Sequence, residues 1–146
     1  MNYGRLVLAV IVATIVDACY GFGVYGVLLS GQFAQYPAVY RTGEAGQAYL
    51  PLMFAGLLVA IAAAALMYAK GYEGGSGAAE GLRFGFLLGL FVFFAFSGVN
   101  YAVLNIGGRL ELAAGIAGFV EWTIIGLVIG LLYKPAHAPA RRGAGV

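Results

Sequence analysis

Charged side chains are scarce in this sequence. Asp, Glu, Lys and Arg make up 10% of its 146 residues, whereas a soluble domain carries about 25%. With 62% hydrophobic residues, the composition is that of a membrane protein. The formal net charge is only +2, and the basic residues lie at the ends of apolar segments, which argues against binding to nucleic acid.

Cysteine and histidine are nearly absent. Cys19 is the only cysteine, so the chain cannot form an internal disulfide. His137 is the only histidine and lies in the polar C-terminal segment, so no apolar segment supplies a histidine for haem or a metal ion. No Ser/His, Cys/His or metal-ligating set is present. We therefore expect no cofactor, no metal and no enzymatic activity.

Four long apolar segments organise the chain, at about residues 6–29, 50–69, 83–104 and 112–133. The first has 24 residues and, as a helix, would be about 36 Å long, enough to cross a hydrocarbon core of roughly 30 Å. The sequence predicts an all-α fold, an integral membrane four-helix bundle over residues 1–134, with a flexible cytoplasmic tail at 135–146. A short interfacial helix is expected between the first two spans and a tight turn at residues 105–109.

A weak internal similarity relates the two halves of the chain. The segment GVYGVL at residues 23–28 resembles GVNYAVL at residues 98–104, with one insertion. The second and fourth spans both end in a Tyr that is soon followed by Lys. This pattern suggests two tandem helical hairpins.

The distribution of basic residues predicts the orientation of the spans. If the N-terminus is cytoplasmic, the inside holds six basic residues and the outside holds two, Arg41 and Arg109. Loops rich in Lys and Arg stay in the cytoplasm. We therefore expect a multi-pass protein of the bacterial inner membrane with both termini cytoplasmic.

Two acids lie within the predicted spans. Asp17 is about 16 Å and Glu121 about 18 Å from the cytoplasmic ends of the first and fourth spans, at 1.5 Å per residue. The two carboxyl groups could meet if these spans are neighbours, and they would then share at least one proton.

Three interpretations of these acids remain open. They could form a proton or cation site in a transport pathway. Alternatively, they could be protonated and serve in packing, or pair with a basic residue of another subunit. Residues that could bond to them in the packing interpretation are Thr14, Tyr20, Trp122 and Thr123.

Small residues at four-residue spacing mark two of the spans. Gly81, Gly85 and Gly89 form one ridge, and Gly126 and Gly130 form another. Such ridges let helix backbones approach closely in a membrane, so we expect them to pack helices together or to contact a partner subunit.

A polar group is predicted at the outer end of the third span. Its members are Ser97, Asn100, Asn105 and Arg109. Asn and Ser within a span usually bond to a neighbouring helix, and here they could also line an outer vestibule.

The segments VDACYGFGVYG, YAKGYEGG, NYAVLNIGGRL and FVEWTIIGLVIGLLYKP resemble small bacterial four-helix inner-membrane proteins of unknown function. In architecture alone the chain is similar to the small multidrug-resistance transporters, which have an essential acid in the first span, matched in position by Asp17. The strong charge bias and the additional Glu121 depart from that family.

The leading functional hypothesis is a non-enzymatic membrane protein that serves as an accessory or assembly subunit of a larger membrane complex, or as a homo-oligomer. Its expected partners are the lipid bilayer and other membrane subunits or further copies of itself. The alternative is a small proton-coupled transporter or channel that uses Asp17 and Glu121.

Overall fold

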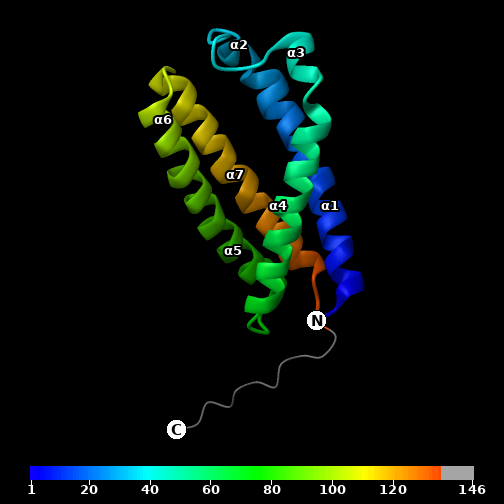
Figure 1. Ribbon diagram of the computed structural model, residues 1–146. Coiled ribbons are helices and arrows are strands. Elements are labelled where there is room, and N and C mark those ends of the chain that lie inside the picture. Colours follow the sequence, from blue (N-terminus) through cyan, green and yellow to red (C-terminus); the bar gives the residue numbers. More distant parts are fainter. Residues whose placement is uncertain (136–146) are drawn as a thin grey trace.

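The computed structural model describes residues 1–135 (Figure 1). Every regular element in this range is a helix, which confirms the all-α prediction for the described residues. The predicted tail at 135–146 lies almost wholly outside them. In chain order, the elements are α1 (Tyr3–Gly21), the π-helix η1 (Phe22–Leu28), α2 (Ser30–Phe33), α3 (Gly43–Gln47), α4 (Leu50–Gly71), α5 (Gly77–Val92), the π-helix η2 (Phe93–Gly98), α6 (Val99–Val103) and α7 (Gly108–Leu132).

Four helical segments are long and apolar enough to cross a membrane, as expected of a multi-pass membrane protein. They are Tyr3–Leu28, Leu50–Gly71, Gly77–Val103 and Gly108–Leu132. The third begins six residues before the predicted position 83, and the fourth begins four residues before 112. Both helices open with an acid in the first turn, Glu80 and Glu111, where a negative charge favours the helix N-terminus. The predicted turn at 105–109 was therefore too long, because α7 already starts at Gly108.

Helix α7 is the central element of the structure. It packs closely against α5 along its length, and it also contacts α1 and α4 (Figure 1). Helix α1 packs against α4 on the other side. The first and last spans are therefore neighbours, although they are the most distant in sequence.

Glycines allow α5 and α7 to approach backbone to backbone. A Cβ atom added at Gly81 would lie 2.7 Å from the carbonyl oxygen of Gly126, and one at Gly85 would lie 2.5 Å from that of Thr123. Gly89 faces the carbonyl oxygen of Phe119 in the same way, and Gly130 faces Gly81. The structure thus places both predicted glycine ridges on one helix contact.

The molecule has two distinct ends, a loop end and a terminal end. The loop end carries residues 29–49 and 104–107, and the terminal end carries Met1, residue 135 and the α4–α5 turn (Figure 1). Fully buried side chains of α1, α4 and α7 gather toward the terminal end, among them Ala13, Ile61 and Ile129. The ring of Tyr133 closes this core, 6.1 Å from that of Tyr68.

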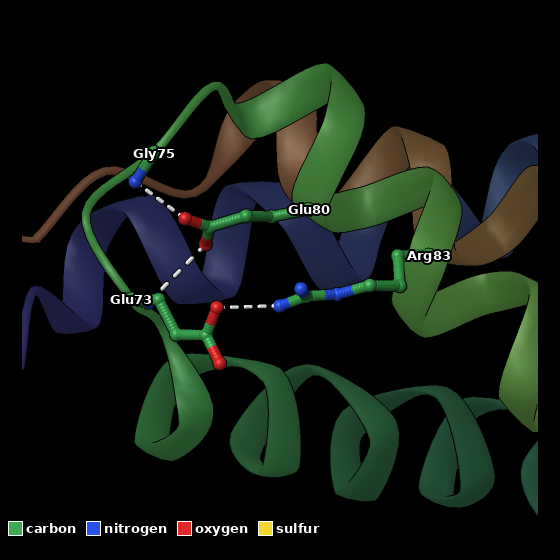
Figure 2. Close-up of polar contacts among 4 residues, drawn as sticks. All are labelled: Glu73, Gly75, Glu80 and Arg83. Atoms are coloured by element: carbon green, nitrogen blue, oxygen red, sulfur yellow. Dashed lines mark hydrogen bonds and ion pairs between the residues drawn. The ribbon is translucent and has the colours of Figure 1, made fainter.

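A polar clasp holds the α4–α5 turn (Figure 2). The turn bends at Gly74, whose φ of 88° is unfavourable for other residues. The Glu80 carboxylate accepts hydrogen bonds from the backbone N–H groups of Glu73 and Gly75. The Arg83 guanidinium pairs with the Glu73 carboxylate at 2.5 Å. These bonds satisfy the polar groups of a tight turn between two apolar helices.

The first loop contains two short helices, α2 and α3, where one interfacial helix was expected. Aromatic rings organise it: Phe33 lies edge-on to Tyr40 with 4.9 Å between ring centroids. The Tyr36 hydroxyl reaches across to Gly107 before α7. The loop thus touches the start of the last span.

Candidate functional site

Asp17 of α1 and Glu121 of α7 meet in the middle of the molecule. Their side chains are 2% and 8% exposed, and both line the same groove. Both Asp17 oxygens are buried, and no N–H or O–H group of the described residues donates to them. The structure therefore brings the two predicted acids together.

The proximity of the two carboxyl groups favours a shared proton. Ionised carboxylates only accept hydrogen bonds, so one carboxyl group must be protonated before it can donate to the other. Two negative charges this close in a medium of low dielectric constant would repel strongly. The pair is therefore a site whose proton content can change, and whose charge depends on that content.

Tyr25 is the group that connects Glu121 to the loop end. Its hydroxyl donates to Oε2 of Glu121 at 3.1 Å. Tyr25 was not among the site residues predicted from the sequence. A signal was present, because Tyr25 lies eight positions after Asp17 and positions i and i+8 share a helix face. Tyr20, which was singled out, instead donates to the carbonyl oxygen of Ala117 at 2.9 Å.

The other proposed bonding partners of the acids lie elsewhere. The Thr14 hydroxyl donates to the carbonyl oxygen of Val10 at 2.8 Å, and that of Thr123 donates to Phe119 at 2.7 Å. Both hydroxyls therefore bond to a carbonyl oxygen of their own helix, as Ser and Thr commonly do inside helices. Trp122 packs against the core of the terminal end.

A groove leads to the carboxyl pair. We call it the carboxyl groove; its volume is about 710 Å³, and Asp17 and Glu121 line it together with Tyr25. One wall is α4 between Leu50 and Leu57, and the loop residue Arg41 borders it. A second cavity of about 590 Å³ shares Tyr25 and Arg41 with it and extends along the first loop. The carboxyl groove is thus continuous with the loop end.

Basic side chains are scarce in the carboxyl groove. Arg41 is the one basic residue among its lining residues. The Arg41 guanidinium lies over the ring of Tyr49, 4.2 Å from its centroid, in a cation–π contact. It belongs to the first loop, so the pair has no cationic partner at its own depth within the described residues.

The predicted polar group at the end of the third span does not form one site. Ser97 in η2 lies against Gly115 and lines a cavity together with Glu111. Asn100 is half-buried, whereas Asn105 and Arg109 are exposed. Arg109 lines a separate cavity with Tyr36 and other loop residues.

Glu111 is a third buried acid, and its burial was not predicted from the sequence. It is 5% exposed and lines a cavity of about 310 Å³ with Ser97 and Tyr101. Burial, and after it the nearby Glu111 carboxylate, raise the pKa of Tyr40 in the first loop above its usual value. A signal for this burial was its place four residues before Gly115, on the helix face that packs against the third span.

No match is found for the chain among protein-family models, curated proteins or solved structures. Its function must therefore be inferred from the side chains described above.

Proposed function

We propose that this chain is a non-enzymatic, multi-pass membrane protein that works as a small proton-coupled transporter, with the Asp17–Glu121 pair as its proton site. The observation that carries this proposal is that two buried acids line one groove, in which the loop residue Arg41 is the one basic lining residue. An ionisable residue inside a span costs about 2.5–3.5 kcal/mol on insertion scales. Two such residues that face each other and an open groove are therefore best explained by a function.

The proposed setting is a bacterial inner membrane crossed by a bundle of the four long helices. Arg5, Lys70 and Lys134 all lie at the terminal end, as the chain order of the helices shows. Because basic loops stay in the cytoplasm, this end would face the cytoplasm. The loop end and the mouth of the carboxyl groove would then face outward.

Proton flux through reconstituted vesicles tests the proposal. Proteoliposomes that contain a trapped pH indicator would be given a pH gradient or a potassium diffusion potential. We expect flux that depends on pH in the wild-type protein and at least a ten-fold loss in Asp17→Asn and Glu121→Gln. Glu73→Gln, which changes an exposed acid of the α4–α5 turn, serves as the matched control. Unchanged flux in both pair variants would rule out the transport role.

A second candidate is an accessory subunit of a larger membrane complex, or a homo-oligomer. It is favoured by the exposed aromatic side chains of the third span, where Phe91, Phe94 and Phe96 are 63%, 67% and 59% exposed. Aromatic side chains are enriched at protein interfaces. In this role the acid pair would be a structural contact or would pair with a basic residue of the partner.

Native purification separates the two candidates. The protein would be tagged, extracted from its source membrane in mild detergent, and analysed by mass spectrometry. Stoichiometric recovery with other membrane subunits would support the accessory role. Recovery of a monodisperse monomer alone would remove its basis.

A further inference from the structure

Two cavities meet at the start of α7, at the loop end. The first, which we call the Arg109 cavity, has a volume of about 420 Å³ and is also lined by Gln32 and Tyr36 of the first loop. The second, the Glu111 cavity of about 310 Å³, is lined by residues of η2, α6 and α7. Gly108 lines both cavities and has no side chain to separate them.

The Arg109 cavity presents hydrogen-bond donors. The Arg109 side chain is exposed and takes no part in the one ion pair of the described residues, which joins Arg83 and Glu73. No side chain caps the N-terminus of α7, so N–H groups at the start of this helix remain available beside the positive end of its dipole. A guanidinium, a side-chain amide and backbone N–H groups around one cavity suit a phosphate group.

The Glu111 cavity presents an acceptor. The Glu111 side chain is only 5% exposed, yet it lines this cavity together with Ser97. No basic residue is among the described lining residues, which otherwise include Phe93, Tyr101 and Leu112. A buried carboxylate is costly unless a positive charge and hydrogen-bond donors meet it. An ammonium group in this cavity would supply both.

The two cavities lie at the depth of lipid headgroups in the proposed membrane setting. Helix α7 has 25 residues and is about 37 Å long, whereas the hydrocarbon core is roughly 30 Å thick. Its first turn would therefore extend into the headgroup layer. Beside the Glu111 cavity, Leu112, Ile116 and Val120 are exposed at four-residue spacing and form one apolar strip along the helix. The acyl chains of a bound lipid would lie along this strip.

We propose that the two cavities together bind the headgroup of phosphatidylethanolamine. Its phosphate lies against Arg109 and Gln32, and its ammonium group donates to the Glu111 carboxylate. Charge complementarity selects this headgroup, because phosphatidylglycerol would leave Glu111 without a cation and the trimethylammonium group of phosphatidylcholine has no N–H to donate. The inference requires the chain to span a membrane but does not depend on proton transport.

The bound lipid would join two parts of the chain. The walls of the Arg109 cavity come from the first loop and from the start of the last span. A phosphate held between them would fix the loop against α7, where Tyr36 already lies against Gly107.

Native mass spectrometry of the delipidated protein tests the inference. The protein in a non-ionic detergent would be titrated with dioleoyl phosphatidylethanolamine and, in parallel, with the choline and glycerol lipids that have the same acyl chains. We expect one ethanolamine lipid per chain, retained at least five-fold more tightly than either of the others. Glycerophosphoethanolamine, the headgroup without acyl chains, should not compete at equal concentration.

Variants assign the two halves of the headgroup. Arg109→Gln should weaken the binding of all three lipids at least five-fold, because each carries a phosphate. Glu111→Gln should remove the preference for the ethanolamine lipid, while binding of the choline lipid stays within two-fold. Arg5→Gln and Glu44→Gln change an exposed base and an exposed acid outside the two cavities and serve as matched controls. Circular dichroism and size-exclusion profiles would establish that each variant folds, and the comparison of the three lipids on the wild type needs no variant.

The contrary outcomes are distinct. Equal retention of the three lipids by the wild type, or tighter retention of phosphatidylglycerol, would overturn the inference. Unchanged selectivity in Glu111→Gln would refute the contact between the ammonium group and the acid. Competition by the free headgroup at equal concentration would replace the lipid with a soluble phosphate compound. None of these results bears on proton flux, which Asp17→Asn and Glu121→Gln test separately.

Discussion

At the terminal end, Ile61, Ile125 and Ile129 are fully buried, whereas at the loop end η1, η2 and α6 contain no buried residue. The same four spans thus form a close contact at one end and an open one at the other. At the terminal end, alanines such as Ala13 and Ala65 pack together with the isoleucines and with Tyr68 and Tyr133 in one core. Two π-helices occupy the half that opens.

The carboxyl pair lies between the closely packed terminal end and the open loop end. Tight packing on the terminal side keeps water and counter-charges away from Asp17, and in the proposed transport role the open loop side would give the pair a route to exchange protons. A buried titratable group needs both conditions to be useful. The site therefore depends on the difference in packing between the two ends as much as on the two acids.

The largest effect is expected from breaking the close contact. Gly126→Ala adds a Cβ against the backbone of Gly85 and Gly81 and should lower the free energy of unfolding by about 1–3 kcal/mol through overpacking. Gly56→Ala is the matched control, because nothing lies within 4 Å of its added Cβ. Thermal unfolding in detergent, followed by circular dichroism, would measure both. Equal effects would contradict the glycine contact.

Thiol labelling would sharpen the contrast between the ends. In a Cys19→Ser background, cysteines would replace Met53 in the carboxyl groove, Ala65 in the core and Leu58 on the exposed face of the same helix. We expect a membrane-impermeant methanethiosulfonate to modify Met53→Cys from the loop side at least ten times faster than Ala65→Cys. Leu58→Cys, which would face lipid, should also react slowly. Similar rates at the three positions would show that no aqueous groove opens at the loop end.

A smaller effect is expected from Tyr25→Phe. This change removes the hydroxyl that donates to Glu121 and should cost about 1 kcal/mol of stability, the net value of one such hydrogen bond. Tyr101→Phe changes an exposed tyrosine and should have no measurable effect. The midpoints of thermal unfolding of the two variants would be compared with that of the wild type. A larger loss in Tyr101→Phe would refute the assigned role of Tyr25.

Effects no larger than that of Tyr25→Phe are expected in the polar clasp of the α4–α5 turn. Glu80→Ala leaves two backbone N–H groups without their acceptor and should cost about 1 kcal/mol. Arg83→Gln breaks an exposed ion pair, and such pairs contribute little. Chemical denaturation of both variants would rank them. A greater loss in Arg83→Gln would reverse the assignment.

Much of the fold was predictable because it depends on composition. The apolar segments of membrane length predicted four long helices. The similar depth of Asp17 and Glu121 within their spans indicated that the two acids could meet. The starts of the third and fourth helices were misplaced, since a count of apolar residues ignores the polar first turns at Glu80 and Glu111.

The missed parts of the site depend on helix rotation and on partners distant in sequence. Tyr25 lies inside η1, and a π-helix has i→i+5 bonding and a different winding from an α-helix. The spacing of eight residues from Asp17 was a signal for Tyr25, but no pattern in this sequence indicates the π-helical winding. Thr14 and Thr123 were wrong partners because each hydroxyl has a carbonyl oxygen of its own helix within reach.

The contact between the first and last spans also has a consequence for the order of synthesis. Tyr25 and Glu121 are 96 positions apart, and chains are generally folded from the N-terminus as they emerge. In a chain that inserts as proposed, Asp17 enters the bilayer long before Glu121 is made. The proposed proton site would therefore be completed only by the final helix, and a chain cut short before α7 would be left with an unpaired acid in its first span.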